Sequence, residues 1–226
     1  MKDFKSLQNI HKDKDIWIVS GGPSLNHIDK SFFENKIVLG VNDIFRYFDC
    51  DYVVVKDCNE EPRFPRLVQE LKEKDIPLIY SQYYKGYEEK GLNNCDNPNS
   101  YMFKHNPRKK DFDMELMELD IDEEIIVSRS TVTTAVHIAY YMGAKNIILC
   151  GHDGGEIDGQ MYYHEYVEKD WKSASNWDGI KGFLNNMEKE IIALKQLLNF
   201  NDVNICSLNP FINLRLEGTK FETYKI

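Results

Sequence analysis

The sequence lacks the features that mark a membrane-spanning or secreted protein. It has no run of about 18 apolar residues, the length that a helix needs to cross a bilayer. Its first fifteen residues, MKDFKSLQNIHKDKD, contain no apolar core of the kind that a secretory signal requires. The five cysteines form neither a CxxC pair nor a zinc-type spacing, and Cys150 and Cys206 end apolar runs as buried thiols would. We therefore expect a reducing, cytoplasmic setting.

The chain also lacks an excess of basic residues. Its formal net charge is -9, which argues against nonspecific nucleic-acid binding, because phosphate backbones are bound by a basic face. A small anionic ligand is still allowed, since it needs only a local group of donors. With 226 residues, of which 42% are hydrophobic, the chain is long enough for a single α/β domain over 1–226.

Several well-known motifs are absent as well. There is no GxGxxG after the first apolar run, no GxxxxGK[ST] and no GxSxG, so a dinucleotide fingerprint, a P-loop and a hydrolase nucleophile elbow have no support. HxH, HExxH and paired Cys/His spacings are missing too, and we expect no metal ligands on this basis.

What is present begins with the stretch 16–25, IWIVSGGPSL. Its continuous apolar run predicts a strand that is buried on both faces, as in a parallel sheet. Gly21 and Gly22 allow a sharp turn and close approach of a ligand, while Pro23 and Ser24 suit the start of a helix. The pattern fits an anion site at a helix start. It equally fits a tight turn with no ligand.

The rest of the chain repeats this alternation of apolar runs and helical spacing. It predicts an α/β fold with a mostly parallel sheet flanked by helices. Two polar segments, 81–124 and 156–177, are too long for plain connections and are expected to be lid-like insertions. The further predicted strands are 37–41, 52–56, 76–80, 124–127, 146–150 and 203–208, the predicted helices are 65–74, 132–143 and 178–200, and 209–226 is expected to be a short helix and tail.

Polar residues follow the predicted strands, and a parallel sheet gathers them along its carboxyl edge. Arg129 can bind a phosphate bidentately beside a helix N-terminus. Each residue also has a structural interpretation: Asn42, Ser128 and Ser130 as helix caps, Asp153 as a turn former, and His152 as a packed histidine. The edge residues are Ser20, Gly21, Gly22, Ser24, Asn42, Asp43, Asp57, Ser128, Arg129, Ser130, Thr131, Gly151, His152, Asp153, Ser207 and Asn209.

Several separated blocks together resemble a known superfamily. They are SGGPSL, a strand that ends in Asn42, the segment SRSTVTTAVHIAYYMGAKNIILCGHD, and CSLNP. The set resembles the bacterial sialyltransferases of glycosyltransferase family 42, with their GNGPSL, Gly-x-Asp and CPNS segments. It is also similar to the family of unknown-function domain 115, which includes motility-associated and hydroxymethylpterin diphosphokinase-like proteins.

The resemblance implies a Rossmann-like α/β fold, whose mostly parallel twisted sheet binds a nucleotide-activated sugar, CMP-linked in the sialyltransferases. Residues 21–24 (Gly21, Gly22, Pro23 and Ser24) would approach the phosphate and ribose, Asn42 the nucleotide, Ser130 and Thr131 the base or phosphate, and Asp153 the ribose or sugar. Tyr162 and Tyr163 lie in a loop whose counterpart holds the leaving phosphate. The sialyltransferases place a general-base histidine in a loop that here reads SASNWDG, without histidine. His164 is the nearest substitute, and His152 can serve by position.

The resulting hypothesis is a cytoplasmic glycosyltransferase that transfers a sugar from a CMP-linked donor to a glycan or protein acceptor, with no tightly bound cofactor. One alternative is a diphosphokinase-like transferase that uses ATP and Mg²⁺, held by Asp57 and Asp153. Another is a nucleotide-binding module without catalysis. A homo-oligomer is compatible with each of them.

Overall fold

A computed structural model describes residues 1–56, 58, 63–81, 95–107, 119, 124–164, 177–208 and 222–223. For 105–107, 177–186 and 222–223 it describes the backbone only. Asp57 and Asn209, both expected at the ligand site, lie outside the described residues, as do large parts of 81–124 and 156–177.

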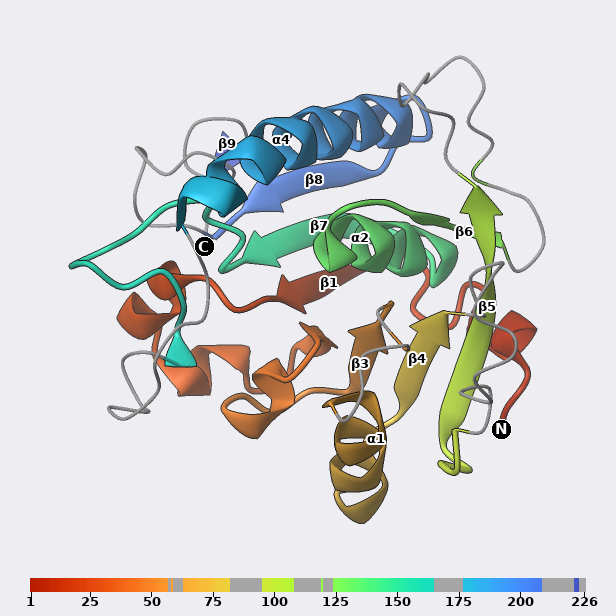
Figure 1. Ribbon diagram of the computed structural model, residues 1–226. Coiled ribbons are helices and arrows are strands. Elements are labelled where there is room, and N and C mark those ends of the chain that lie inside the picture. Colours follow the sequence, from red (N-terminus) through yellow and green to blue (C-terminus); the bar gives the residue numbers. More distant parts are fainter. Residues whose placement is uncertain are drawn as a thin grey trace.

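The described strands form one twisted parallel sheet in the order β6-β5-β4-β3-β2-β1-β7-β8-β9 (Figure 1). Every strand pair is parallel, so all carboxyl ends meet at one edge. The strands are β1 (Lys14–Val19), β2 (Ile37–Val41), β3 (Tyr52–Val55), β4 (Leu78–Ser81), β5 (Ser100–Pro107), β6 (Glu124–Val127), β7 (Ala144–Cys150), β8 (Asn204–Ser207) and β9 (Glu222–Thr223). The expected Rossmann-like α/β fold is confirmed.

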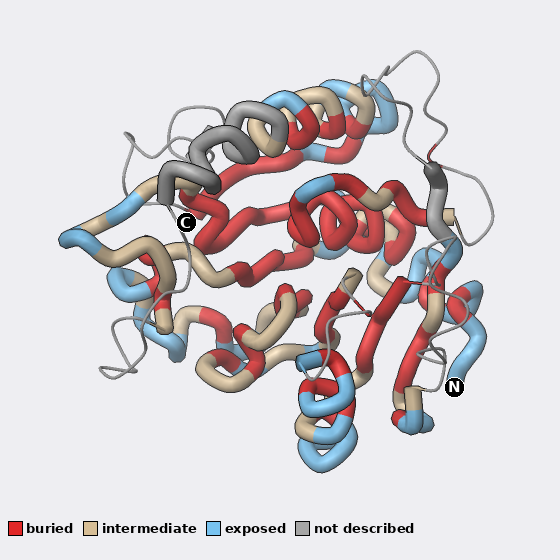
Figure 2. The backbone as a smooth tube through the Cα atoms, viewed as in Figure 1, coloured by how far each residue is buried: buried red, intermediate tan, exposed pale blue. Residues whose placement is uncertain are grey.

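The central strand β1 is buried on both faces, as its apolar run predicts. Ile16 and Ile18 join the hydrophobic core on one face of the sheet, whereas Trp17 and Val19 join the core on the other. Figure 2 shows the same continuous burial along β1 and β7. A strand of this kind must be covered by helices on both sides.

Helices supply that cover. On one face lie α2 (Thr131–Tyr141), α4 (Trp177–Asn199) and the short 3₁₀ helix η1 (Phe4–Leu7), whose buried side chains share one core. On the other face lie α1 (Arg63–Glu73) and three 3₁₀ helices, η2 (Pro23–His27), η3 (Lys30–Phe33) and η4 (Ile44–Arg46). No helix within the described residues is both long and apolar enough to cross a membrane.

Two strands and one helix start differ from the sequence expectation. β5 lies inside the expected insertion 81–124. Its apolar run, Tyr101–Phe103, is only three residues long, with Tyr101 and Phe103 buried and Met102 between them partly exposed. β9 is only two residues long and lies in the expected tail. The helix after the glycines is 3₁₀, and its cap is Gly22 without a side-chain hydrogen bond, so Ser24 is not its cap.

The strand order places β1 beside both β2 and β7. The chain builds outward from β1 to β6 on one side and then returns to the other side of β1. In open α/β sheets, ligands bind beyond the carboxyl ends of the strands where the order reverses. The topology therefore predicts a ligand site at the turns after β1 and β7.

Candidate functional site

The turns after β1 and β7 are locked together by hydrogen bonds. The Ser20 N–H donates to the Cys150 carbonyl at 2.9 Å, and the Gly22 N–H donates to the Gly151 carbonyl at 2.7 Å. The Ser20 hydroxyl also donates to the Gly151 carbonyl. We call residues 20–24 the glycine turn. Its shape is fixed by the strand next to it before any ligand arrives.

The two glycines of this turn face different surroundings. A Cβ atom built on Gly22 would lie 2.4 Å from the Gly151 carbonyl oxygen and 2.4 Å from Asp153 Oδ2, so only glycine fits there. A Cβ atom built on Gly21 would meet no atom of the described residues within 4 Å. Gly22 is therefore required by packing against the turn after β7, whereas the side of Gly21 on which a Cβ would stand is open.

Asp153 holds the other end of the glycine turn. One carboxylate oxygen accepts the Ser24 N–H at 2.7 Å, and the residue is only 2% exposed. Desolvation raises the pKa of Asp153 to about 6, opposed by its hydrogen bonds with Ser24 and by the charge of His27. The carboxylate thus has a structural partner, and the expected contact with the ribose or sugar stays a prediction.

The two histidines suggested as bases have different environments. His152 is buried, and desolvation lowers its pKa to about 4, so it is neutral near pH 7 but shielded from solvent. His164 is partly exposed and stacks on Tyr162, with ring centroids 5.3 Å apart and planes at 12°. Of the two residues, His164 is the less buried, although its Nε2 atom is itself buried.

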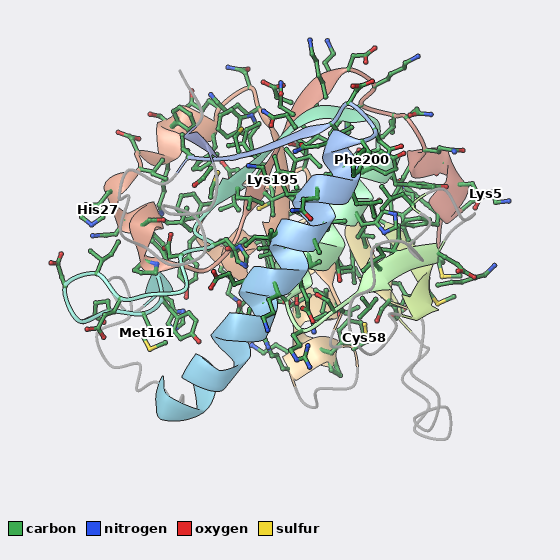
Figure 3. The ribbon with its side chains drawn as sticks, turned by 90° about the horizontal axis from the view of Figure 1, so that it is seen from above. Lys5, His27, Cys58, Met161, Lys195 and Phe200 are labelled. Carbon is green, nitrogen blue, oxygen red and sulfur yellow. The ribbon has the colours of Figure 1, made fainter. Side chains whose placement is uncertain are left out.

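Tyr163 connects the segment after β7 to the glycine turn. Its N–H donates to the Gly21 carbonyl at 2.9 Å, and its buried ring packs against Phe48 with a centroid distance of 4.9 Å. In Figure 3, Met161 of this segment and His27 of η2 lie at the same end of the molecule, opposite Lys5. The segment 154–164 therefore returns to the carboxyl edge of the sheet.

A second loop, residues 128–130, leads from β6 into α2; we call it the arginine loop. Ser130 caps α2 by accepting the Val132 N–H at 3.2 Å, while the Ser128 hydroxyl accepts the Ser130 N–H at 3.3 Å. Of the two expected caps, the structure selects Ser130. Thr131, the first residue of α2, is buried beside it.

Two residues that the sequence analysis did not single out hold this loop. Glu190 of α4 accepts the Arg129 backbone N–H at 3.2 Å and a guanidinium N–H at 2.7 Å. Lys56, directly after β3, donates to the carbonyls of Ser128 at 2.9 Å and Arg129 at 3.1 Å. Glu190 had a recognisable signal: it lies three residues after Met187 and four before Leu194, within the apolar stripe of α4.

The contact with Lys56 places the arginine loop beside the carboxyl end of β3. The loop itself follows β6, five strands from β1 in the sheet, and the Lys56 side chain connects it to β3, which is two strands from β1. Between them, Asn42 follows β2 with a left-handed φ of 57°. Its N–H donates to the Val54 carbonyl, and it does not cap η4, whose N-cap is Asp43.

The described residues offer little for a metal ion. They contain no group of three or more His, Cys, Asp or Glu side chains arranged to hold one. Of the two carboxylates considered for Mg²⁺, Asp153 is already bonded to Ser24 and Asp57 lies outside the described residues. The surroundings of Asp153 do not fit a Mg²⁺ ligand, which has to face the bound phosphates.

The structure is thus a Rossmann-like α/β domain. At the carboxyl edge of its sheet it carries two preformed loops, the glycine turn and the arginine loop. The chain belongs to the family described as 6-hydroxymethylpterin diphosphokinase MptE-like, whose profile matches residues 1–159. This confirms the superfamily to which the sequence blocks pointed. No curated protein sequence matches the chain.

Solved structures with the same fold come from bacterial transferases. The sialyltransferase CstII from Campylobacter jejuni, in complex with CMP-3FNeuAc, has a TM-score of 0.50 at 16% identity over 94% of this chain and 89% of CstII. CstII with cytidine-5'-monophosphate gives a TM-score of 0.51 at 16% identity, over 95% and 89%. The MAf glycosyltransferase from Magnetospirillum magneticum AMB-1 gives 0.50 at 14%, over 88% of this chain and 33% of its own. At sequence identities this low, the structural similarity shows a shared fold and nothing more.

Proposed function

We propose that the carboxyl edge from β1 to β3 binds a nucleotide-activated sugar, CMP-linked, and that the protein transfers the sugar to a glycan or protein acceptor. One observation carries the proposal. A glycine turn open at Gly21 and a capped helix N-terminus with a fixed arginine, Arg129, lie on the same edge. The structures of CstII with CMP ligands support the choice of cytidine.

Within this proposal the two loops divide the donor between them. The guanidinium of Arg129 and the N–H groups of the first turn of α2, beside Ser130 and Thr131, suit the phosphate. The open backbone at Gly21 suits close approach of the ribose and the phosphate oxygens nearest to it. Asn42, partly exposed between the two loops, offers an amide to the nucleotide.

The reaction would be a direct displacement at the anomeric carbon. The acceptor oxygen forms the new bond to carbon while the bond from carbon to the phosphate oxygen breaks, and CMP leaves with that electron pair. The acceptor proton passes to a general base, for which we propose His164 because His152 is buried. Tyr162 orients the His164 ring by stacking on it. Tyr163 contributes through its hydrogen bond to Gly21.

The family description favours a second candidate, transfer of a diphosphate from ATP with Mg²⁺. That reaction needs carboxylates that face the metal ion. Asp153, the described member of the suggested pair, is buried and bonded to Ser24. For this reason we favour the sugar transferase, and we derive no step through a metal ion.

Thermal-shift measurements separate the candidates. We expect CMP to raise the melting temperature without metal, since a ligand at a hundred times its Kd adds about 2.7 kcal/mol of stability. CDP, UDP, GDP and ATP, each with and without Mg²⁺, are the comparison set. A shift seen only with ATP and Mg²⁺ would establish the second candidate, and no shift with any nucleotide would contradict both.

Turnover is then tested through His164. With a CMP-sugar and an acceptor, H164A should release CMP at least about a hundredfold more slowly than the unmodified chain while binding CMP equally well. The matched control is H11A, which removes a histidine bonded to Tyr52 near the amino ends of the strands. Binding of CMP without release of CMP by either protein would identify a nucleotide-binding module.

A further inference from the structure

The carboxylate of Glu190 is buried in the protein and binds a partly exposed arginine. Glu190 is 2% exposed, and it accepts two hydrogen bonds from Arg129, one from the backbone N–H and one from the guanidinium. Burying a carboxylate is unfavourable unless it is paired, and apolar residues often replace such pairs without loss of stability. Stability of the fold therefore explains this placement poorly.

The pair leaves part of the Arg129 guanidinium available. Glu190 takes one of its terminal N–H groups, and within the described residues no hydrogen bond involves Nε or the other terminal nitrogen. The Arg129 side chain is 34% exposed, so part of it is open to solvent. A guanidinium that is held through one terminal N–H group can still donate two parallel hydrogen bonds to a phosphate through its remaining N–H groups.

The backbone of the arginine loop has supports other than Glu190. Lys56 bonds the carbonyls of Ser128 and Arg129, and Ser130 caps α2. What Glu190 adds is control of the Arg129 side chain, together with one backbone N–H. A long arginine side chain otherwise loses about 2 kcal/mol of rotamer freedom when it is fixed by a ligand.

We propose that Glu190 is a positioning residue, which fixes the Arg129 guanidinium so that its remaining N–H groups receive the phosphate of the bound nucleotide. The inference rests on the proposed nucleotide site and assigns a role to a residue of α4, far along the chain from the arginine loop. Glu190 itself touches neither the donor nor the reacting atoms.

Electrostatics and positioning predict opposite results for E190Q. Removal of a negative charge beside the site would by itself strengthen phosphate binding. Loss of the charge-assisted bond to Arg129 releases the guanidinium and weakens phosphate binding, by about tenfold for a misplacement well under 1 Å. A comparison of CMP with cytidine, which lacks the phosphate, isolates this effect.

The experiment measures the Kd of CMP and of cytidine for the unmodified chain, E190Q, R129A and E190Q/R129A. We expect E190Q and R129A each to raise the Kd of CMP about tenfold, and the double variant to raise it no more than R129A alone does. The Kd of cytidine should stay within about twofold of the value for the unmodified chain in all three variants. The matched control is E70Q, which removes the partner of Arg46 in a pair of the same chemistry on α1 and should leave both affinities unchanged.

Contrary outcomes separate the two proposals. If the unmodified chain binds no CMP, the proposed function fails. If R129A weakens CMP but E190Q binds it as well as or better than the unmodified chain, the function stands and the role of Glu190 is wrong. Should E190Q not fold, E190D retracts the carboxylate by one methylene while keeping its charge. E190D should then raise the Kd of CMP at least threefold without changing the Kd of cytidine. An equal loss of affinity for both ligands would show that Glu190 has a merely structural role.

Discussion

Two buried carboxylates, Asp153 and Glu190, hold the two loops at the same sheet edge, and they do so differently. Each is 2% exposed. Asp153 accepts a backbone N–H of the glycine turn, whereas Glu190 accepts a backbone N–H and a guanidinium N–H of the arginine loop. One carboxylate fixes a backbone shape, and the other fixes a cation as well.

This difference bears on where the negative charge of the donor belongs. Desolvation raises the pKa of Asp153 to about 6, so its ionised form is less favoured than in solvent, and a phosphate beside it would disfavour that form further. The arginine loop carries a guanidinium and a helix N-terminus, both of which attract anions. We therefore expect the phosphate to lie toward the arginine loop and the neutral ribose toward the glycine turn.

The largest effect is expected from G22A. A methyl group at this position would lie 2.4 Å from a backbone carbonyl and 2.4 Å from Asp153 Oδ2, so the turns after β1 and β7 must move apart. We expect a loss of about 3 kcal/mol in the free energy of unfolding, at the upper end of overpacking effects, and with it the loss of CMP binding. Urea denaturation measures the first and calorimetry the second.

G21A is the matched control for this prediction. Its added methyl group has open space around it, and the φ of Gly21 is not in the left-handed region, so stability should stay within about 0.5 kcal/mol. If CMP affinity nevertheless falls in G21A, the open backbone faces the ligand. Equal destabilisation by both substitutions would contradict the distinction between the two glycines.

Asp153 should give the protein a pH dependence of a particular sign. Because its pKa in the folded chain is raised above the ordinary value of 3.8, the folded state binds more protons than the unfolded state between about pH 4 and 6. This group's contribution to stability is therefore complete below about pH 4 and is lost as the pH rises through 6. A pKa difference of this size corresponds to about 3 kcal/mol as an upper figure.

D153N removes this titration and keeps an oxygen that accepts the Ser24 N–H. Urea denaturation of both proteins from pH 4 to pH 8 should show the variant gaining about 2 kcal/mol relative to the unmodified chain. The control is D51N, which changes an exposed carboxylate that accepts the Val38 N–H at 2.7 Å. Parallel curves for D153N and the unmodified chain would show that Asp153 titrates as in solvent.

The comparison of the loops also shows where sequence reasoning succeeds. Continuous apolar runs such as those of β1 and β2 mark strands buried on both faces, and the start of α2 is evident from Ser130 and its apolar spacing. β5 escapes this reasoning because its apolar run, Tyr101–Phe103, is only three residues long and lies within a long polar segment. Local pattern thus gave the fold class and most strands of the sheet.

Sequence patterns predict which residues lie at the carboxyl edge of the sheet, but they do not predict which of these residues contact one another. Glu190 follows Arg129 by 61 residues, and the contact depends on how α4 crosses α2, which no local pattern encodes. Gly21 and Gly22 are the same residue type, and only the positions of Gly151 and Asp153 in the folded chain distinguish them. The pairing of Asp153 with Ser24 was likewise invisible, since it requires the register of β1 against β7.

The smallest effect is expected at Ser130, and it separates the structural role of the arginine loop from its proposed binding role. S130A removes the cap of α2 and should lower the free energy of unfolding by about 1 kcal/mol, whereas S128A should lower it less. S130D restores a capping oxygen and adds a negative charge that the helix N-terminus favours, so stability should return. The same charge competes with a phosphate. S130D should therefore be as stable as the unmodified chain and yet bind CMP more weakly than S130A, and if both variants bind CMP equally, the phosphate lies elsewhere on the edge.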